Sequence, residues 1–140
     1  MADVIYNSYK KDLLDGAINH VSDTIKAALV TSVYTANQDT HKFFSDITNE
    51  VTGTGYTAGG EALATKTTSQ DDTDNEGVFD AADTIWAAST ITARGAIVYK
   101  DTGTASTSPL ICFIDFVGDQ SSSAGDFKIQ WDAEGIINIG

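Results

Sequence analysis

The acidic stretch that begins at Asp72 contains the side chains best suited to holding a metal ion. Asp72, Asp74, Glu76 and Asp83 follow part of the spacing of an EF-hand calcium loop, in which side-chain oxygens bind the ion. The match is incomplete because Asp83 stands where the pattern needs glutamate and because the residues that follow indicate a strand, not a helix. We expect an acidic, solvated turn over residues 71–76. A weak surface site for Ca²⁺ or Mg²⁺ is the alternative, and we assign no metal ligands.

A second candidate for chemistry is the glycine-rich segment 53–60, which invites comparison with phosphate-binding loops. The dinucleotide-binding pattern needs a glycine where this chain has Ala58, and it needs a strand before and a helix after. No Gly-Lys-Ser/Thr follows for a P-loop. We interpret these glycines as turn residues.

The remaining reactive side chains do not form a recognisable catalytic pattern. His20 and His41 lie in unrelated polar contexts and are expected to be exposed loop residues, and there is no Gly-x-Ser-x-Gly motif. Cys112 lies in an apolar run and is expected to be buried. Trp86 and Trp131 occupy inward-facing strand positions, which favours core packing over sugar stacking. We therefore predict no catalytic residues, no cofactor and no enzymatic activity.

The composition narrows the range of partners that the protein is expected to bind. The 140 residues include 20 acidic and 8 basic side chains, which give a net charge of −12. Affinity for nucleic acids depends on Lys and Arg, so DNA, RNA and anionic membranes are predicted to be poor partners. The single arginine, Arg94, lies in a mostly apolar strand and is expected to form an ion pair. The length suits one domain over 1–140, without disulfides, a membrane span or a secretory signal.

The elements that must position these residues are predicted to be strands. The chain has 18 Thr and 11 Ser, and its acids are mainly Asp, which favours strands and turns over helices. Residues 6–16 predict a short helix, and one further helical turn is expected within 40–47. The expected strands are 24–32, 63–68, 78–80, 84–86, 91–100, 110–117, 127–131 and 136–139, with a loop over 118–125. The fold class is all-β: a single antiparallel β-sandwich, jelly-roll or immunoglobulin-like, with a short N-terminal helix.

Two segments are candidates for contact with a partner: the N-terminal segment, and the long segment 34–60, which lacks a sustained hydrophobic period. Aromatic residues are enriched in interface cores. The candidate contact residues are Tyr6, Tyr9, Leu13, Phe43, Phe44 and Tyr56. The alternative is that these side chains fill the ends of the sandwich.

Several motifs, taken in order, resemble a family of small virion proteins of tailed bacteriophages. The motifs lie at residues 53–60, 79–86, 90–101, 109–111, 114–116 and 120–121. The similarity extends over nearly the whole chain. It implies an all-β structural component of the virion, with no catalytic residues to transfer.

Within such a particle, we predict a capsid decoration or cement protein bound to the outside of the head. Its partners would be the major capsid protein or other virion proteins, and a homotrimer would suit a three-fold position on the shell. The protein would be made in the host cytoplasm and reside in the virion. The alternatives are a component of the tail or the head-to-tail connector, and a host-surface binding module in which Ca²⁺ assists sugar binding.

Overall fold

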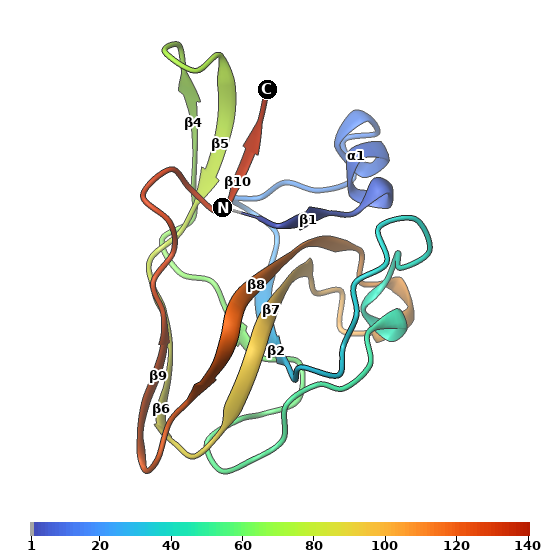
Figure 1. Ribbon diagram of the computed structural model, residues 1–140. Coiled ribbons are helices and arrows are strands. Elements are labelled where there is room, and N and C mark those ends of the chain that lie inside the picture. The colour runs from blue at the N-terminus through green and yellow to red at the C-terminus, as the bar shows by residue number, and fades with distance from the viewer. Residues whose placement is uncertain (1) are drawn as a thin grey trace.

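The computed structural model describes residues 2–140, which form antiparallel strands in three sheets and one short helix (Figure 1). The largest sheet has the order β1-β8-β7-β2-β3. Its strands are β1 Val4–Ile5, β8 Leu110–Ser121, β7 Thr92–Lys100, β2 Ile25–Val30 and β3 Glu61–Ala62. This arrangement is the expected all-β, antiparallel, sandwich-like fold.

Two smaller sheets flank the large one. The first has the order β10-β5-β4, and the second pairs β6 with β9. Their strands are β10 Ile137–Ile139, β5 Glu76–Asp80, β4 Thr67–Asp71, β6 Thr84–Ser89 and β9 Gly125–Ile129. The helix α1 is Asn7–Leu14, and two short 3-10 turns, η1 Phe44–Asp46 and η2 Ala105–Thr107, lie in the connections.

Apolar residues on both faces place β2 and β7 inside the large sheet. The two strands pair from Ile25 opposite Lys100 to Val30 opposite Gly95, and nearly all of their side chains are buried. A strand that is apolar on both faces loses stability at an exposed position, so burial on both sides is the favourable arrangement. Each of the two strands accordingly has a partner on both edges, β2 between β7 and β3 and β7 between β8 and β2.

The core is one continuous cluster of buried side chains that extends from Tyr6 to Ile137. Trp86 and Trp131 lie within it, as predicted, with 1% and 8% of their surface exposed. Cys112 is fully buried, also as predicted. Arg94 forms the expected ion pair, with its Nε 3.0 Å from Asp115 Oδ1.

The hairpin of β4 and β5 stands away from the body of the protein, at the top of Figure 1. Every residue of β4 except Asp71 is exposed, and β5 has only Phe79 fully buried. A two-stranded ribbon is marginal in water on its own. The antiparallel pairing of β5 with β10 therefore anchors this hairpin to the core.

Several predicted strand boundaries are wrong: the strand predicted at 127–131 is Gly125–Ile129, and the one predicted at 84–86 continues to Ser89. Residues 63–66 are not a strand, because Thr65 adopts a positive φ of 51° and the chain crosses there from the large sheet to the hairpin. Leu63 nevertheless is buried, and its N–H donates to Ile25 O. Conversely, β8 continues through the predicted loop as far as Ser121, which pairs with Thr92. No helix within residues 2–140 has the length and apolar character needed to cross a membrane.

Candidate functional site

Two of the six candidate contact residues lie inside the protein. Tyr6 and Tyr9 are 0% and 1% exposed, because β1 pairs with β8 and turns α1 onto the large sheet. Burial raises the pKa of both phenols. In this conformation neither side chain offers area to a partner.

A chain of hydrogen bonds links Tyr6 to a histidine. The ring nitrogen Nδ1 of His41 accepts the backbone N–H of Asn37 at 3.3 Å, so the Tyr34 hydroxyl, 2.9 Å from the same atom, must be a donor to it. The Tyr6 hydroxyl then donates to the Tyr34 oxygen at 2.8 Å. His41 is therefore half-buried and fixes the loop beside β1. The prediction of an exposed loop residue is wrong for it.

His20 has a comparable structural role. Its Nε2 lies 2.7 Å from the Tyr9 hydroxyl, and its ring packs on Phe79 with the centroids 4.8 Å apart. Burial lowers the pKa of His20, because the charged imidazolium loses its hydration there. His20 joins α1 to the hairpin and is not the exposed residue that its polar neighbours predicted.

Of the three candidate contact residues in the segment 34–60, one is exposed. Phe43 is 39% exposed and bridges to Pro109 through the backbone. Phe44 instead stacks on Tyr99, with centroids 4.2 Å apart. Tyr56 is half-buried: its hydroxyl donates to Glu50 Oε2 at 2.6 Å and accepts the N–H of Leu29. Phe44 and Tyr56 thus pack and bond within the chain, whereas Phe43 has surface to offer.

Leu13, the sixth candidate, lines an apolar groove of about 140 Å³ between α1 and the hairpin. We call this the α1–β5 groove. The side chains lining it are mainly apolar, and they are Tyr9, Leu13, His20, Val78, Phe79, Ile137 and Ile139, with Thr68, Ser69 and Gly77 at the edge. Leu14, the next residue of the helix, is 90% exposed, and Ile139 is 41% exposed. Exposed apolar groups that adjoin a groove are typical of a surface that contacts another molecule.

The acidic tip of the hairpin brings three carboxylates together. Oxygens of Asp71, Asp74 and Glu76 lie within 4.8 Å of one another. Asp71 also accepts the N–H groups of Thr73 and Asp74, and Glu76 accepts from Asn138 at 2.5 Å. These hydrogen bonds are those of a tight turn and are sufficient to explain why the carboxylates lie close together. The distances between the carboxylate oxygens are also compatible with a weakly held cation.

Comparisons of the chain with protein-family models, with curated proteins and with solved structures found no match. The resemblance to phage virion proteins therefore stays a prediction. What the fold adds is a location for contact: the α1–β5 groove, whose lining includes Leu13 and Ile139, the latter 41% exposed.

Sequence reasoning missed Leu14 and Ile139 as surface groups. The signal for Leu14 is present in the helix period: Tyr9 and Leu13 lie four residues apart and share the buried face, so Leu14, about 100° further round, points outward. Ile139 gives no such signal. It pairs with Gly77 towards the projecting end of the hairpin, whereas Ile137, on the same face of β10, pairs with the buried Phe79 and is itself buried.

Proposed function

We propose that this protein is a non-enzymatic structural component of a tailed-phage virion, specifically a decoration protein on the outside of the capsid. Two features support the proposal: the ordered motifs that resemble phage virion proteins, and a net charge of −12 that disfavours contact with packaged DNA. The observation that carries it is the α1–β5 groove, an apolar contact surface beside a projecting acidic hairpin. The partner is the major capsid protein or another virion protein.

The oligomer we propose is a homotrimer at a three-fold position of the shell. Native mass spectrometry tests this directly. A trimer gives a mass three times the chain mass of 14.8 kDa, whereas a monomer at all concentrations up to those in the particle contradicts it.

The abundance of the protein in purified particles tests the position. A decoration protein approaches the copy number of the major capsid protein, which quantitative gel densitometry or mass spectrometry measures. A handful of copies per particle contradicts the decoration role and favours the tail or the head-to-tail connector.

Binding to emptied, expanded shells tests the groove. The variant Ile139→Asp is expected to weaken binding at least ten-fold, because it places a charge in the apolar lining of the groove at a side chain that is 41% exposed. Val33→Asp is the matched control, since Val33 is also apolar and is 69% exposed, but lies in the turn after β2 and does not line the groove. Equal binding by both variants excludes the groove as the contact.

Point variants are preferable to removal of the N-terminal segment. Deleting residues 1–16 takes away Tyr6 and Tyr9, which are core residues, and the strand β1 that pairs with β8. Loss of binding in such a truncation would report loss of the fold.

A further inference from the structure

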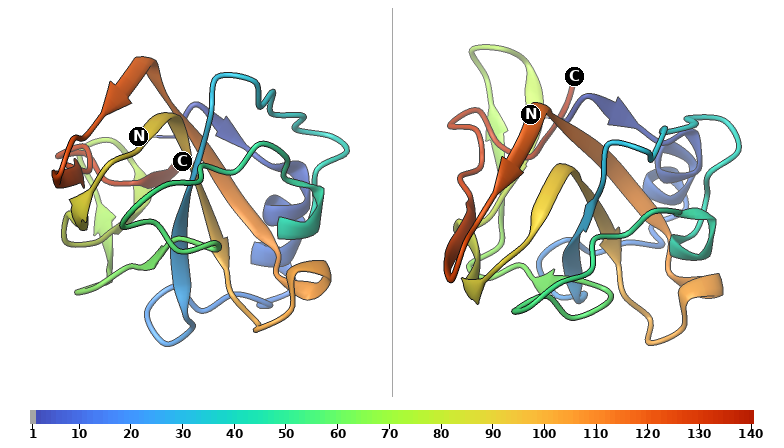
Figure 2. Two further views of the ribbon diagram at one scale, coloured as in Figure 1. Left: turned by 90° about the horizontal axis from the view of Figure 1, so that it is seen from below. Right: turned by 60° about the horizontal axis from the view of Figure 1, so that its bottom comes forward.

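The strands β8 and β9 are consecutive, yet they do not pair with each other. A short turn joins them at residues 122–124, but β8 pairs with β7 and β1, and β9 pairs with β6. Antiparallel strands joined by so short a turn ordinarily form a hairpin. Both views of Figure 2 show β8 and β9 diverging from the turn instead. A cavity of about 380 Å³ lies between the two strands, and we call it the β8–β9 groove.

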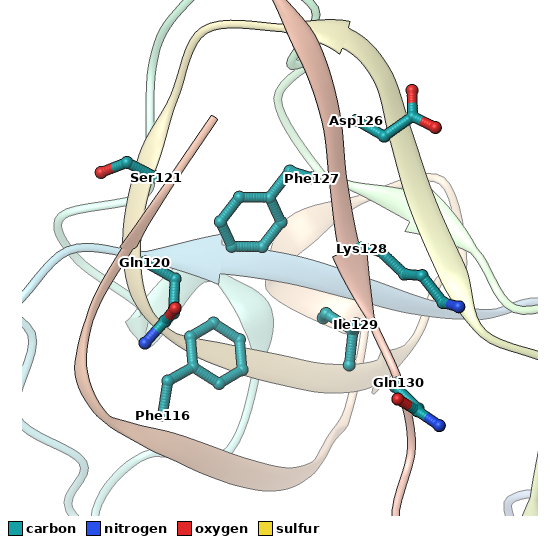
Figure 3. A pocket seen from close by; sticks show the side chains of 8 residues that line it. All are labelled: Phe116, Gln120, Ser121, Asp126, Phe127, Lys128, Ile129 and Gln130. Atoms are coloured by element: carbon teal, nitrogen blue, oxygen red, sulfur yellow. The ribbon is translucent and has the colours of Figure 1, made fainter. Parts of the chain in front are cut away.

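One wall of this groove is an open strand edge. Five consecutive residues, 126–130, line it. Figure 3 shows Phe127 and Ile129 directed into the groove, whereas the side chains of Asp126 and Lys128 point to the other side of β9. Side chains alternate along a strand, so a wall made of consecutive residues includes the backbone itself. The second edge of β9 has no partner strand among residues 2–140.

The opposite wall comes from an irregular part of β8. Ala93 lies opposite Gln120 and Gly95 opposite Asp115. The four residues 116–119 of β8 are therefore opposite a single residue of β7, Arg94. Bulges of this kind re-aim side chains and are frequent beside functional sites. Here the bulge holds Phe116 over the groove, with its ring centroid 6.2 Å from that of Phe127.

The bulge is strained and specifically supported. Val117 is β-branched yet has a positive φ of 70°, and 83% of its surface is exposed. Asp115 Oδ1 fixes this conformation by accepting the N–H of Val117 at 2.8 Å and Arg94 Nε at 3.0 Å. Because packing does not explain an exposed valine in this conformation, the strain points to a function of the bulge.

The charges beside the groove are predominantly negative. Arg94 is neutralised by Asp115, and Lys128 by Asp83 at 3.0 Å. Asp119 and Asp126 are exposed and have no ion-pair partner within the described chain. A ligand that carries positive charge is therefore favoured next to the groove.

We propose that the β8–β9 groove binds an extended segment of another polypeptide, which adds a strand to the free edge of β9. An apolar side chain of that segment lies against Phe116 and Phe127, and flanking Lys or Arg residues approach Asp119 and Asp126. Backbone bonds to the open edge give such a segment affinity, and the apolar floor gives it selectivity. The proposal does not depend on the assignment to a virion, because it concerns the isolated protein and a short peptide.

Within the described sheets the outer edges of β4 and β6 are also unpaired, and β4 serves as an internal comparison. Its residues Thr67–Asp71 are polar, and the first four are exposed, so no apolar floor accompanies that edge. A segment that seeks only backbone bonds would pair with β4 as readily as with β9. A segment that also carries an apolar side chain and basic flanking residues would select the β8–β9 groove.

The test uses ¹⁵N-labelled full-length protein and two synthetic peptides, acetyl-Lys-Thr-Val-Thr-Val-Thr-Lys-amide and the same peptide with Glu in place of both Lys. Amide shift changes are expected in residues 116–121 and 125–130, together with slower hydrogen exchange along β9. The Lys peptide is expected to bind at least five-fold more tightly at low salt, and the difference should shrink at high salt. No saturable change at millimolar peptide, or changes centred on β4, would overturn the proposal.

Variants separate the apolar contact from the charge. Phe116→Ser is expected to weaken the Lys peptide at least ten-fold, and the paired reversal D119K/D126K to make the Glu peptide the tighter ligand. The control D72K/D74K makes the same change of charge at the hairpin tip and should leave the preference for Lys intact. If the control reverses the preference as well, the attraction is a general effect of net charge and the proposal fails. If Phe116→Ser unfolds the protein, the charge-reversal pair still decides.

Discussion

Gly60 lies where the glycine-rich segment passes closest to the large sheet, and its replacement by alanine is a sharp test of the fold. Its φ is +80°, and a Cβ built at this position would lie 1.9 Å from the Ala27 carbonyl oxygen and 2.7 Å from Ala28 Cα. Both atoms belong to the backbone of β2, which pairs with β3 immediately after Gly60. The strand cannot yield without disturbing the centre of the sheet.

Two contributions add in Gly60→Ala. A left-handed backbone at a non-glycine residue costs about 1–2 kcal/mol, and forcing extra volume into a packed region costs about 1–3 kcal/mol. Gly103 has a φ of +90° but nothing within 4 Å of an added Cβ, so Gly103→Ala carries only the first contribution. Gly118 has neither a positive φ nor a neighbour within 4 Å, so Gly118→Ala should change stability by less than about 0.5 kcal/mol.

The free energy of unfolding in urea measures all three variants. Trp86 and Trp131 are buried and provide a fluorescence signal for the transition. The expected loss is about 2–5 kcal/mol for Gly60→Ala, from a total of about 5–15 kcal/mol for a domain of this kind. Gly60→Ala and Gly103→Ala of equal stability would show that β3 does not lie against β2 as described.

Three further predictions concern titratable and reactive groups. The pKa of Asp46 is lowered by the N–H groups of Phe43 and Lys42, and that of Asp115 by the Val117 N–H and Arg94. Each carboxylate stabilises the fold fully above its unfolded pKa of about 3.9, and this stabilisation is lost as the pH falls through the lower folded pKa. The free energy of unfolding in urea should therefore decrease less between pH 5 and pH 3 for Asp46→Asn than for the wild-type protein. Burial lowers the pKa of His20, so stability should decrease as the pH falls below about 6.5, and His20→Gln should remove that slope; an unchanged slope contradicts the packing on Phe79. Burial raises the pKa of the Cys112 thiol, so it should react with a disulfide reagent only as fast as the protein opens, and rapid reaction of the native protein contradicts its burial.

The large sheet could be predicted because its physical cause is local. In β2 and β7 both faces are apolar, and only an interior strand buries both. The boundary near Leu63 could not be predicted, since the alternation of Leu63 with Thr65 is typical of a strand while Thr65 in fact turns the chain. The extension of β8 to Ser121 is supported by pairing with Thr92, a partner 29 residues away that no local pattern reveals.

The contact residues illustrate a different limit. Spacing identifies Tyr9 and Leu13 as one face of α1, but it does not say whether that face meets the protein's own sheet or a partner. In the structure both side chains line the groove, but Tyr9 is buried with its hydroxyl 2.7 Å from His20 Nε2, whereas Leu13 is only half-buried. The sequence predicts both histidines on the surface for the same reason: their immediate neighbours are polar, whereas the tyrosine that contacts each ring lies 11 residues away for His20 and 7 for His41.

The ion pairs of the basic side chains determine where the net negative charge of the protein is left uncompensated. At least five of the eight basic side chains form ion pairs with aspartates, among them Lys26 with Asp101 and Lys100 with Asp23 at the end of the large sheet. The positive charges thus stabilise the fold locally, and the carboxylates left without a basic partner include those of the hairpin tip and Asp119 and Asp126 beside the β8–β9 groove. An interface formed by either region gains electrostatically only from a basic partner, and its association rate should therefore decrease with added salt. A contact governed by the apolar α1–β5 groove alone would instead be insensitive to salt, so the ionic-strength dependence of binding distinguishes which surface a partner uses.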